Sequence, residues 1–247
     1  TMGWQPNYQS EGRIYAKHVL EKYPNAKIGV ISANDDFGRD SPKGFKDGLG
    51  DKAKTLIVSE TTYETSDPTI DSQIRKLKAS GADMFVNFTT PKFAAMAIKK
   101  ANELRWKPVH FLNNVSASIG SVLKPAGFEA AQGVISTAYM KDPSDPQWKD
   151  DPGMKKWNAF VDKYMPGANK ADGGIVTAYN DSQTLVEVLK KSGDDLTREN
   201  VMKQAASLKD LEQEMLLPGI KINTPPQDFG PLQQEQLLKF EGESWKR

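Results

Sequence analysis

Short apolar runs alternate with helical segments through the first 137 residues, and this alternation limits the chain to one class of fold. The runs are too short for ordinary helices, so we expect strands at 27–32, 55–60, 82–88, 109–112 and 133–137. The segments between them predict helices at 10–23, around Phe45 and Leu49, from Asp67 and Pro68 to 80, at 89–105 and at 119–123. Such alternation forms βαβ units, so we predict an α/β fold with a mainly parallel sheet covered on both faces.

The alternation ends near residue 138. The stretch KDPSDPQWKDDP at 141–152 is rich in proline and acids, which indicates a crossover rather than a helix or a strand. Three helices are then expected at 154–164, 174–191 and 198–208, without strands between them. Because amphipathic helices need an apolar surface to cover, we expect their sheet to lie elsewhere, in residues before Thr1.

Two strands are expected near the C-terminus, at 219–223 and 232–240, separated by the turn NTPPQDFGP. The chain therefore divides into two predicted lobes. Residues 1–138 form a nearly complete second lobe, residues 139–216 the helical return segment of the first lobe, and residues 217–247 a crossover with terminal strands that pack back on the second lobe.

The composition is that of an ordinary globular chain, and it argues against several partners. The formal net charge is +1 and 26% of residues are charged, so broad attraction to nucleic acid or to a membrane surface is not expected. No apolar run approaches the roughly 18–20 residues of a membrane span. The absence of cysteine excludes disulfides and thiol chemistry and suits an oxidising compartment.

Polar and aromatic side chains follow three of the predicted strands. Ligands of open parallel sheets bind outside the carboxyl ends of the strands, where such loops converge with helix N-termini. Hydroxyls, amides and rings in these loops predict a pocket for a small ligand, although Asn34, Asn113 and Ser116 also suit helix caps. The candidates are Asn34, Asp36 and Phe37 after the first strand, Phe88, Thr89, Thr90 and Phe93 after the third, and Asn113, Asn114 and Ser116 after the fourth.

Catalytic and cofactor sites find little support in the same loops. The stretch ISANDDFGRD has one glycine where a dinucleotide site needs G-x-G-x-x-G, and the phosphate-loop motif is absent. Asp35 and Asp36 are adjacent and diverge, with no third ligand at metal spacing. His18 lies in a predicted helix and His110 in a strand, so each is expected to be structural. We predict no enzyme activity, no cofactor and no metal.

Several segments resemble type I periplasmic solute-binding proteins, of the branched-chain amino-acid group of ABC-transporter receptors. The resemblance rests on the order and spacing of NYQSEGRIYAKHVLEKY, IGVISANDDFGRDSPKGFKDGL, PTIDSQIRKLKASGADMFVNFTTP, AAQGVISTAYM and TAYNDSQTLVEVLKKSG, which span nearly all 247 residues. It implies two Rossmann-like lobes, joined by three crossovers, that close over a ligand in the cleft.

The resemblance also implies roles for particular residues and for the whole protein. By position, Phe37 is the aromatic contact of the second lobe, and Thr89, Thr90 or Phe93 lies at the ligand. Tyr179 sits on the side of the first lobe; an aromatic on such a helix is usually core, but the preceding Gly173-Gly174 keeps a cleft-facing role open. The implied protein is a periplasmic or lipid-anchored monomer that passes a small molecule to an ABC-transporter permease.

One departure from the resemblance bears on the ligand. Amino-acid binders of this group place an acid in the loop after the fourth strand, whereas here that loop is LNNVSAS. A buried ammonium without a counter-charge is costly, so the sequence favours an aromatic or aliphatic carboxylate without an α-amine. Amino acids stay open if Asp35, Asp36 or a residue before Thr1 supplies the charge. A ligand-sensing regulatory domain of the same fold is the alternative function.

Overall fold

The computed structural model describes residues 3–224 and 230–247, which separate into two compact units. Of these residues, Asn7–Thr137 and Leu237–Arg247 form the sheet unit, and the described residues up to Pro6 and within Ala138–Gln236 form the helical unit. The predicted lobe boundaries at 138 and 216 remain predictions. The described residues of 217–236 belong to the helical unit, and residues 237–247 belong to the sheet unit.

The sheet has seven strands in the order β2-β1-β3-β4-β5-β6-β7. Strand β1 pairs in parallel with both β2 and β3, and parallel pairing continues through β4 to β5. The last two strands, β6 and β7, pair antiparallel at one edge. This arrangement confirms the predicted, mainly parallel sheet. The strands are β1 Ile28–Ala33, β2 Ile57–Tyr63, β3 Met84–Phe88, β4 Val109–Leu112, β5 Ile135–Ala138, β6 Gln236–Glu241 and β7 Ser244–Lys246.

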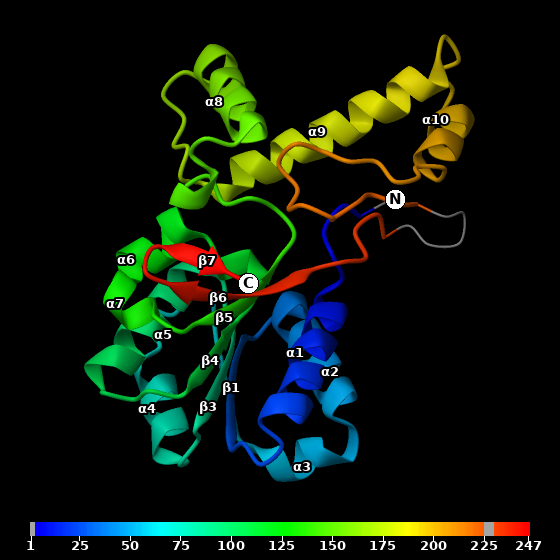
Figure 1. Cartoon of the computed structure of the whole chain (residues 1–247). Coiled ribbons are helices and arrows are strands. Elements are labelled where there is room, and N and C mark those ends of the chain that lie inside the picture. Colours follow the sequence, from blue (N-terminus) through cyan, green and yellow to red (C-terminus); the bar gives the residue numbers. More distant parts are fainter. Residues whose placement is uncertain (1–2, 225–229) are drawn as a thin grey trace. The chain divides into compact units, whose positions relative to one another are not determined.

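Helices cover both faces of this sheet (Figure 1). Alternate residues of β1 divide between two apolar clusters, with Val30 in one and Ile31 in the other. The first cluster includes side chains of α1, α2 and α3, and the second includes those of α4 and α5, so β1 is buried throughout. The helices are α1 Tyr8–Lys22, α2 Asp36–Leu49, α3 Ala53–Leu56, α4 Asp71–Ala79, α5 Pro91–Glu103, α6 Lys124–Ala126 and α7 Phe128–Ala131, with a turn of π-helix at Ile119–Leu123.

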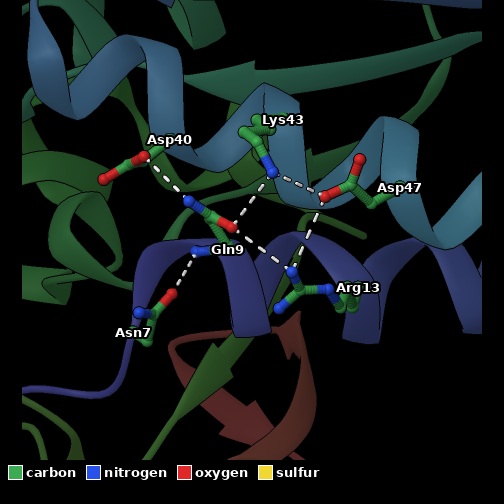
Figure 2. Close-up of polar contacts among 6 residues, drawn as sticks. All are labelled: Asn7, Gln9, Arg13, Asp40, Lys43 and Asp47. Carbon is green, nitrogen blue, oxygen red and sulfur yellow. Dashed lines mark hydrogen bonds and ion pairs between the residues drawn. The ribbon is translucent and has the colours of Figure 1, made fainter.

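Helices α1 and α2 touch backbone to backbone. A Cβ atom added at Gly44 would lie 2.1 Å from the Gln9 carbonyl oxygen, and one at Gly12 would lie 2.4 Å from the Ser41 carbonyl oxygen. Any larger residue at either glycine would therefore push the helices apart. On the outer surface of the pair, exposed polar side chains join the helices: Gln9 Nε2 donates to Asp40 Oδ1 at 3.0 Å, and the Arg13 guanidinium lies 3.6 Å from Asp47 Oδ2 (Figure 2).

The helical unit contains the three helices expected after the crossover, α8 Pro152–Tyr164, α9 Gly173–Ser192 and α10 Arg198–Ala205. Its small core gathers Met154, Trp157, Val161, Val176 and Met215. Large apolar side chains of α8 and α9 remain exposed, among them Phe160 at 39% and Leu185 at 54%. In the described part of the chain, no helix is long and apolar enough to cross a membrane.

Three predicted elements differ most from the structure. Helix α4 begins at Asp71 rather than at Asp67, because the Asp67 carboxylate accepts the Glu64 N–H at 2.9 Å and so closes a separate turn. The predicted strand 219–223 is wrong: Ile222 makes isolated bridges with Leu211 and Leu232 instead. Strand β6 begins later than residue 232, and β7 was not predicted. Of the predicted turn NTPPQDFGP, residues 225–229 lie outside the described residues.

Candidate functional site

The three polar loops expected to converge do lie together at the carboxyl edge of the sheet unit. Ser116 Oγ donates to the Thr89 carbonyl oxygen at 2.6 Å, and Asn113 Nδ2 donates to the same oxygen at 3.1 Å. Tyr63, at the end of β2, accepts the Thr90 N–H at 2.9 Å through its hydroxyl and the Asn34 N–H at 2.9 Å through its carbonyl. Hydrogen bonds thus connect the ends of β1, β2, β3 and β4.

The loop after β1 is shaped by a cap and a glycine. Asp35 Oδ1 accepts the Gly38 N–H at 2.8 Å and so caps α2. A Cβ atom at Gly38 would lie 1.9 Å from the Ala33 carbonyl oxygen, so this position admits only glycine. Asp36 is almost fully exposed and pairs with Arg39 of its own helix. Asn34 is exposed and donates to Glu64 Oε1 at 2.6 Å.

Of the aromatic residues predicted to contact the ligand from the sheet unit, Phe37 has a side chain that remains partly exposed. Its ring is half-buried and packs edge-to-face against Tyr8, with ring centroids 4.9 Å apart and planes at 81°. Tyr8 is the first residue of α1 and Phe37 the second residue of α2, so the two helices bring both rings to the same edge. That edge also carries the loops described above.

Two other predicted contacts are core residues. Phe88 is fully buried, with its ring centroid 6.2 Å from those of Tyr15 and Phe45. Phe93 is 2% exposed and packs on Tyr63 with centroids 4.3 Å apart. Because packing occupies these rings, we do not include Phe88 or Phe93 in the proposed site.

The amide and hydroxyl candidates tie the loops together and do not act as helix caps. No side-chain cap is made by Asn113, and α2 is capped by Asp35 rather than by Asn34. Asn113, Ser116 and Thr89 are buried, and Thr89 Oγ1 donates to Asn87 Oδ1 at 2.7 Å. Within the described residues, Asn113 Oδ1 is buried without a hydrogen-bond partner. These amide and hydroxyl side chains are polar and carry no charge.

A buried carboxyl group lies directly beneath this edge and was not predicted. Glu11 is fully buried, and its Oε1 accepts the Asn114 N–H at 2.6 Å and the Thr137 hydroxyl at 3.1 Å. The Tyr15 hydroxyl lies 2.6 Å from the same oxygen. In the described part of the chain, Oε2 has no partner. Burial raises the pKa of Glu11 to about 7.

The histidines have structural surroundings, as expected. His110 is buried within the sheet, where its Nε2 lies 3.2 Å from Asn87 Nδ2 and its ring lies 4.4 Å from that of Phe85. Burial lowers the pKa of His110 to about 3, so the ring is neutral at pH 7. His18 packs against Phe111 with centroids 5.8 Å apart. Among the described residues, no three His, Cys, Asp or Glu side chains gather as metal ligands.

Tyr179 belongs to the helical unit and is 8% exposed. Its ring packs at 61° to that of Phe160, with centroids 5.0 Å apart. It also lines a groove of about 730 Å³ within this unit, formed by α8, α9 and residues 211–214. Tyr179 thus belongs to the small core of the helical unit, and its contact with a ligand remains a prediction.

Comparison with known proteins gives one family. The family model described as "Periplasmic binding protein" matches residues 1–233. The chain is 26% identical over 190 residues to the "Leu/Ile/Val-binding protein homolog 7" of Brucella suis, covering 75% of this chain and 45% of that protein. The match therefore covers less than half the length of that relative.

Solved structures agree on the fold. A branched-chain amino acid ABC transporter protein from Thermus thermophilus with bound valine superposes with a TM-score of 0.81 at 15% identity, over 96% of this chain and 63% of the other. A fatty acid ABC transporter substrate-binding protein from Thermomonospora curvata gives a TM-score of 0.76 at 21% identity, over 96% and 61%. Identities this low establish the fold alone. Together with the family match, they confirm the resemblance seen in the sequence: the chain belongs to the periplasmic binding protein family and has the type I fold.

Proposed function

We propose that this chain is part of an extracytoplasmic solute-binding protein, which delivers a small carboxylate-bearing molecule to an ABC-transporter permease. The observation that carries the proposal is the carboxyl edge of the sheet unit. There, hydrogen-bonded neutral loops lie beside the half-buried ring of Phe37. Small-ligand sites combine an apolar surface with a few fixed polar groups in this way. Family membership and the names of the relatives support the same function.

The charges at this edge favour a ligand without an amine. The loop after β4 contains no acid, Asp35 is engaged as a helix cap, and Asp36 pairs with Arg39. Glu11 is buried beneath the loop, where its neutral form is stabilised. A ligand ammonium would lose its hydration without gaining a counter-charge, which is costly. We therefore propose aromatic and aliphatic organic acids as the favoured ligand class and amino acids as the second candidate.

Amino acids are the second candidate because of the relatives. The Brucella relative is named for leucine, isoleucine and valine, and the Thermus structure contains valine. A carboxylate that could approach an ammonium is Glu64, which is exposed at the end of β2 and accepts from Asn34. A regulatory sensor of the same fold is the less favoured alternative.

Ligand-observed NMR, followed by calorimetry for each binder, tests the proposal. The probes are benzoate, phenylacetate, octanoate, leucine and valine, each titrated into the purified chain. We expect the acids without an amine to bind and Phe37→Ala to weaken them, whereas Tyr164→Ala, which alters an exposed aromatic of the helical unit, leaves binding unchanged. Tighter binding of leucine than of any acid would contradict the amine-free ligand. Absence of binding by every probe would contradict the solute-binding function.

A further inference from the structure

We propose that Tyr8 is a second ligand-contacting aromatic residue, which forms with Phe37 a right-angled corner that selects ligands carrying a flat aromatic ring. The inference rests on the proposed function and narrows its ligand class. Tyr8 was not among the residues expected at the site, because it precedes the first predicted strand by nineteen residues and lies in none of the loops that follow the predicted strands.

The angle between the Tyr8 and Phe37 rings suits packing against a third ring, that of a ligand. The ring planes of Tyr8 and Phe37 meet at 81°, and both side chains are half-buried, so each keeps an exposed part. A planar ligand in such a corner lies flat on one ring and meets the other edge-on. Both arrangements are favourable for aromatic quadrupoles. An aliphatic chain in the same place gains burial of apolar area but not these oriented contacts.

The close contact of α1 with α2 holds Tyr8 in place. Gln9, the next residue, lies against the backbone of Gly44, where no Cβ would fit. Gln9 also donates to Asp40 of α2, and its Oε1 accepts from Arg13 NH2 at 3.3 Å (Figure 2). A ring whose neighbouring backbone is held in this way loses little further entropy when a ligand packs on it.

Glu11 connects the same turn of α1 to the candidate loops. It lies one helical turn after Tyr8 and accepts the N–H of Asn114 in the loop after β4, at 2.6 Å. Tyr8 is therefore placed at the edge where the loops converge, not on a remote surface. Burial and the neighbouring Glu11 raise the pKa of the Tyr8 hydroxyl, which is neutral at pH 7 and does not repel an anionic ligand.

Affinity ratios test the role of Tyr8. Benzoate and octanoate are titrated into the wild-type chain and into Tyr8→Leu, which keeps apolar bulk but removes the ring, and Tyr8→Phe, which keeps the ring. We expect Tyr8→Leu to weaken benzoate roughly tenfold and octanoate less than about threefold, and Tyr8→Phe to keep the wild-type ratio. Tyr23→Leu, at the opposite end of α1, is the matched control and should not change the ratio. Thermal unfolding of each variant shows whether it is folded.

A second measurement on the wild-type protein avoids any effect of substitution on folding. With ring-labelled tyrosine, we expect a nuclear Overhauser contact between Tyr8 and the benzoate protons, assigned with Tyr8→Phe. Benzoate binding without this contact, or an unchanged ratio in Tyr8→Leu, overturns the role of Tyr8 and leaves the solute-binding function standing. Octanoate binding without benzoate binding also overturns it. Binding of none of the five probes overturns both proposals.

Discussion

Replacing Glu11 by glutamine should remove a large part of the pH dependence of stability between pH 4.5 and about pH 7. Burial supplies the reason, because it disfavours the charged carboxylate, whereas the hydrogen bonds that Glu11 accepts favour the charged form and offset burial only in part. The Tyr15 hydroxyl has one hydrogen, yet it lies 2.7 Å from the Leu112 carbonyl oxygen and 2.6 Å from Glu11 Oε1. The Tyr15 hydroxyl donates toward both oxygens, so neither receives the full strength of that hydrogen bond. An ionised Glu11 therefore shares this donor with Leu112, and among the described residues the groups that shift its pKa include no cation.

The magnitude follows from the raised pKa of Glu11. The unfolded chain releases the proton near pH 4.5, whereas burial keeps it on the folded protein up to about pH 7. The folded state therefore binds more protons in this window, and the free energy of unfolding falls as pH rises. At about 1.4 kcal/mol per pH unit, the contribution that is complete below pH 4.5 and lost by pH 7 is roughly 3 kcal/mol.

Urea unfolding of the wild type and Glu11→Gln at a series of pH values measures this contribution. The difference between the two free energies of unfolding is the useful quantity, because other groups, such as His110 with its lowered pKa, titrate in both proteins and cancel. Glu21→Gln, which removes an exposed acid from the same helix, is the control. A difference that stays constant within about 0.5 kcal/mol from pH 4.5 to 8, the spread of ordinary surface substitutions, would refute the reasoning.

Three further predictions test the packing and charges of the sheet unit. Gly44→Ala should lower the free energy of unfolding by at least about 2 kcal/mol in urea, because its Cβ would meet the Gln9 carbonyl oxygen, whereas Gly173→Ala, with nothing within 4 Å, should be neutral or stabilising. The His110 ring should stay neutral from pH 8 down to pH 5 in NMR titrations, since burial lowers its pKa to about 3; titration near 6.5 would contradict this. Val115→Glu places an acid in the loop after β4 and should raise the affinity for leucine relative to benzoate by roughly tenfold; an unchanged ratio would argue against a missing counter-charge.

The strands of the parallel sheet could be predicted because their sequence pattern is local and strong. Fully buried parallel strands such as Met84–Phe88 read as continuous apolar runs, and Val109–Leu112 was predicted at its observed limits. The predicted strand at 219–223 failed, and the strand predicted at 232–240 was found as β6 with a later start, because pairing decides where such strands form. The apolar residues around Ile222 suit a strand, yet they make isolated bridges only, and sequence periodicity does not report the partner.

Helix starts were less predictable where two caps compete. Asp67-Pro68 is a typical helix beginning, but the same carboxylate is close enough to the Glu64 N–H to close a turn first. Asp35 shows the opposite outcome, since its carboxylate caps α2 through Gly38. Local sequence does not separate these outcomes, because both use the same bond between an aspartate oxygen and a backbone N–H three residues away in the chain.

The candidate loops could be placed by topology, since parallel strands direct their carboxyl ends to one edge. Distinguishing surface residues from core residues within the loops was not possible. Phe37 and Phe88 both end up near that edge, but Phe88 is the last residue of β3 and points into the cluster with Tyr15. Side-chain direction at a strand end depends on the pleat, and a one-residue difference reverses it.

The first turn of α1 carried a signal that the loop-based prediction did not use. Counting back from the buried Tyr15, Ala16 and Val19 by helical spacing places Tyr8, Glu11 and Gly12 on the same inward face. A carboxylate and a glycine on a buried stripe both depart from what stability alone would select. Departures of this kind concentrate where a fold serves its ligand, because the surrounding packing must compensate for them. The compensation is visible here: Gly12 allows α1 to reach α2, Glu11 binds the loop after β4, and the contact holds Tyr8 against Phe37. The same turn that a stability argument would rank as poorly designed is thus the one that aligns the proposed ligand contacts.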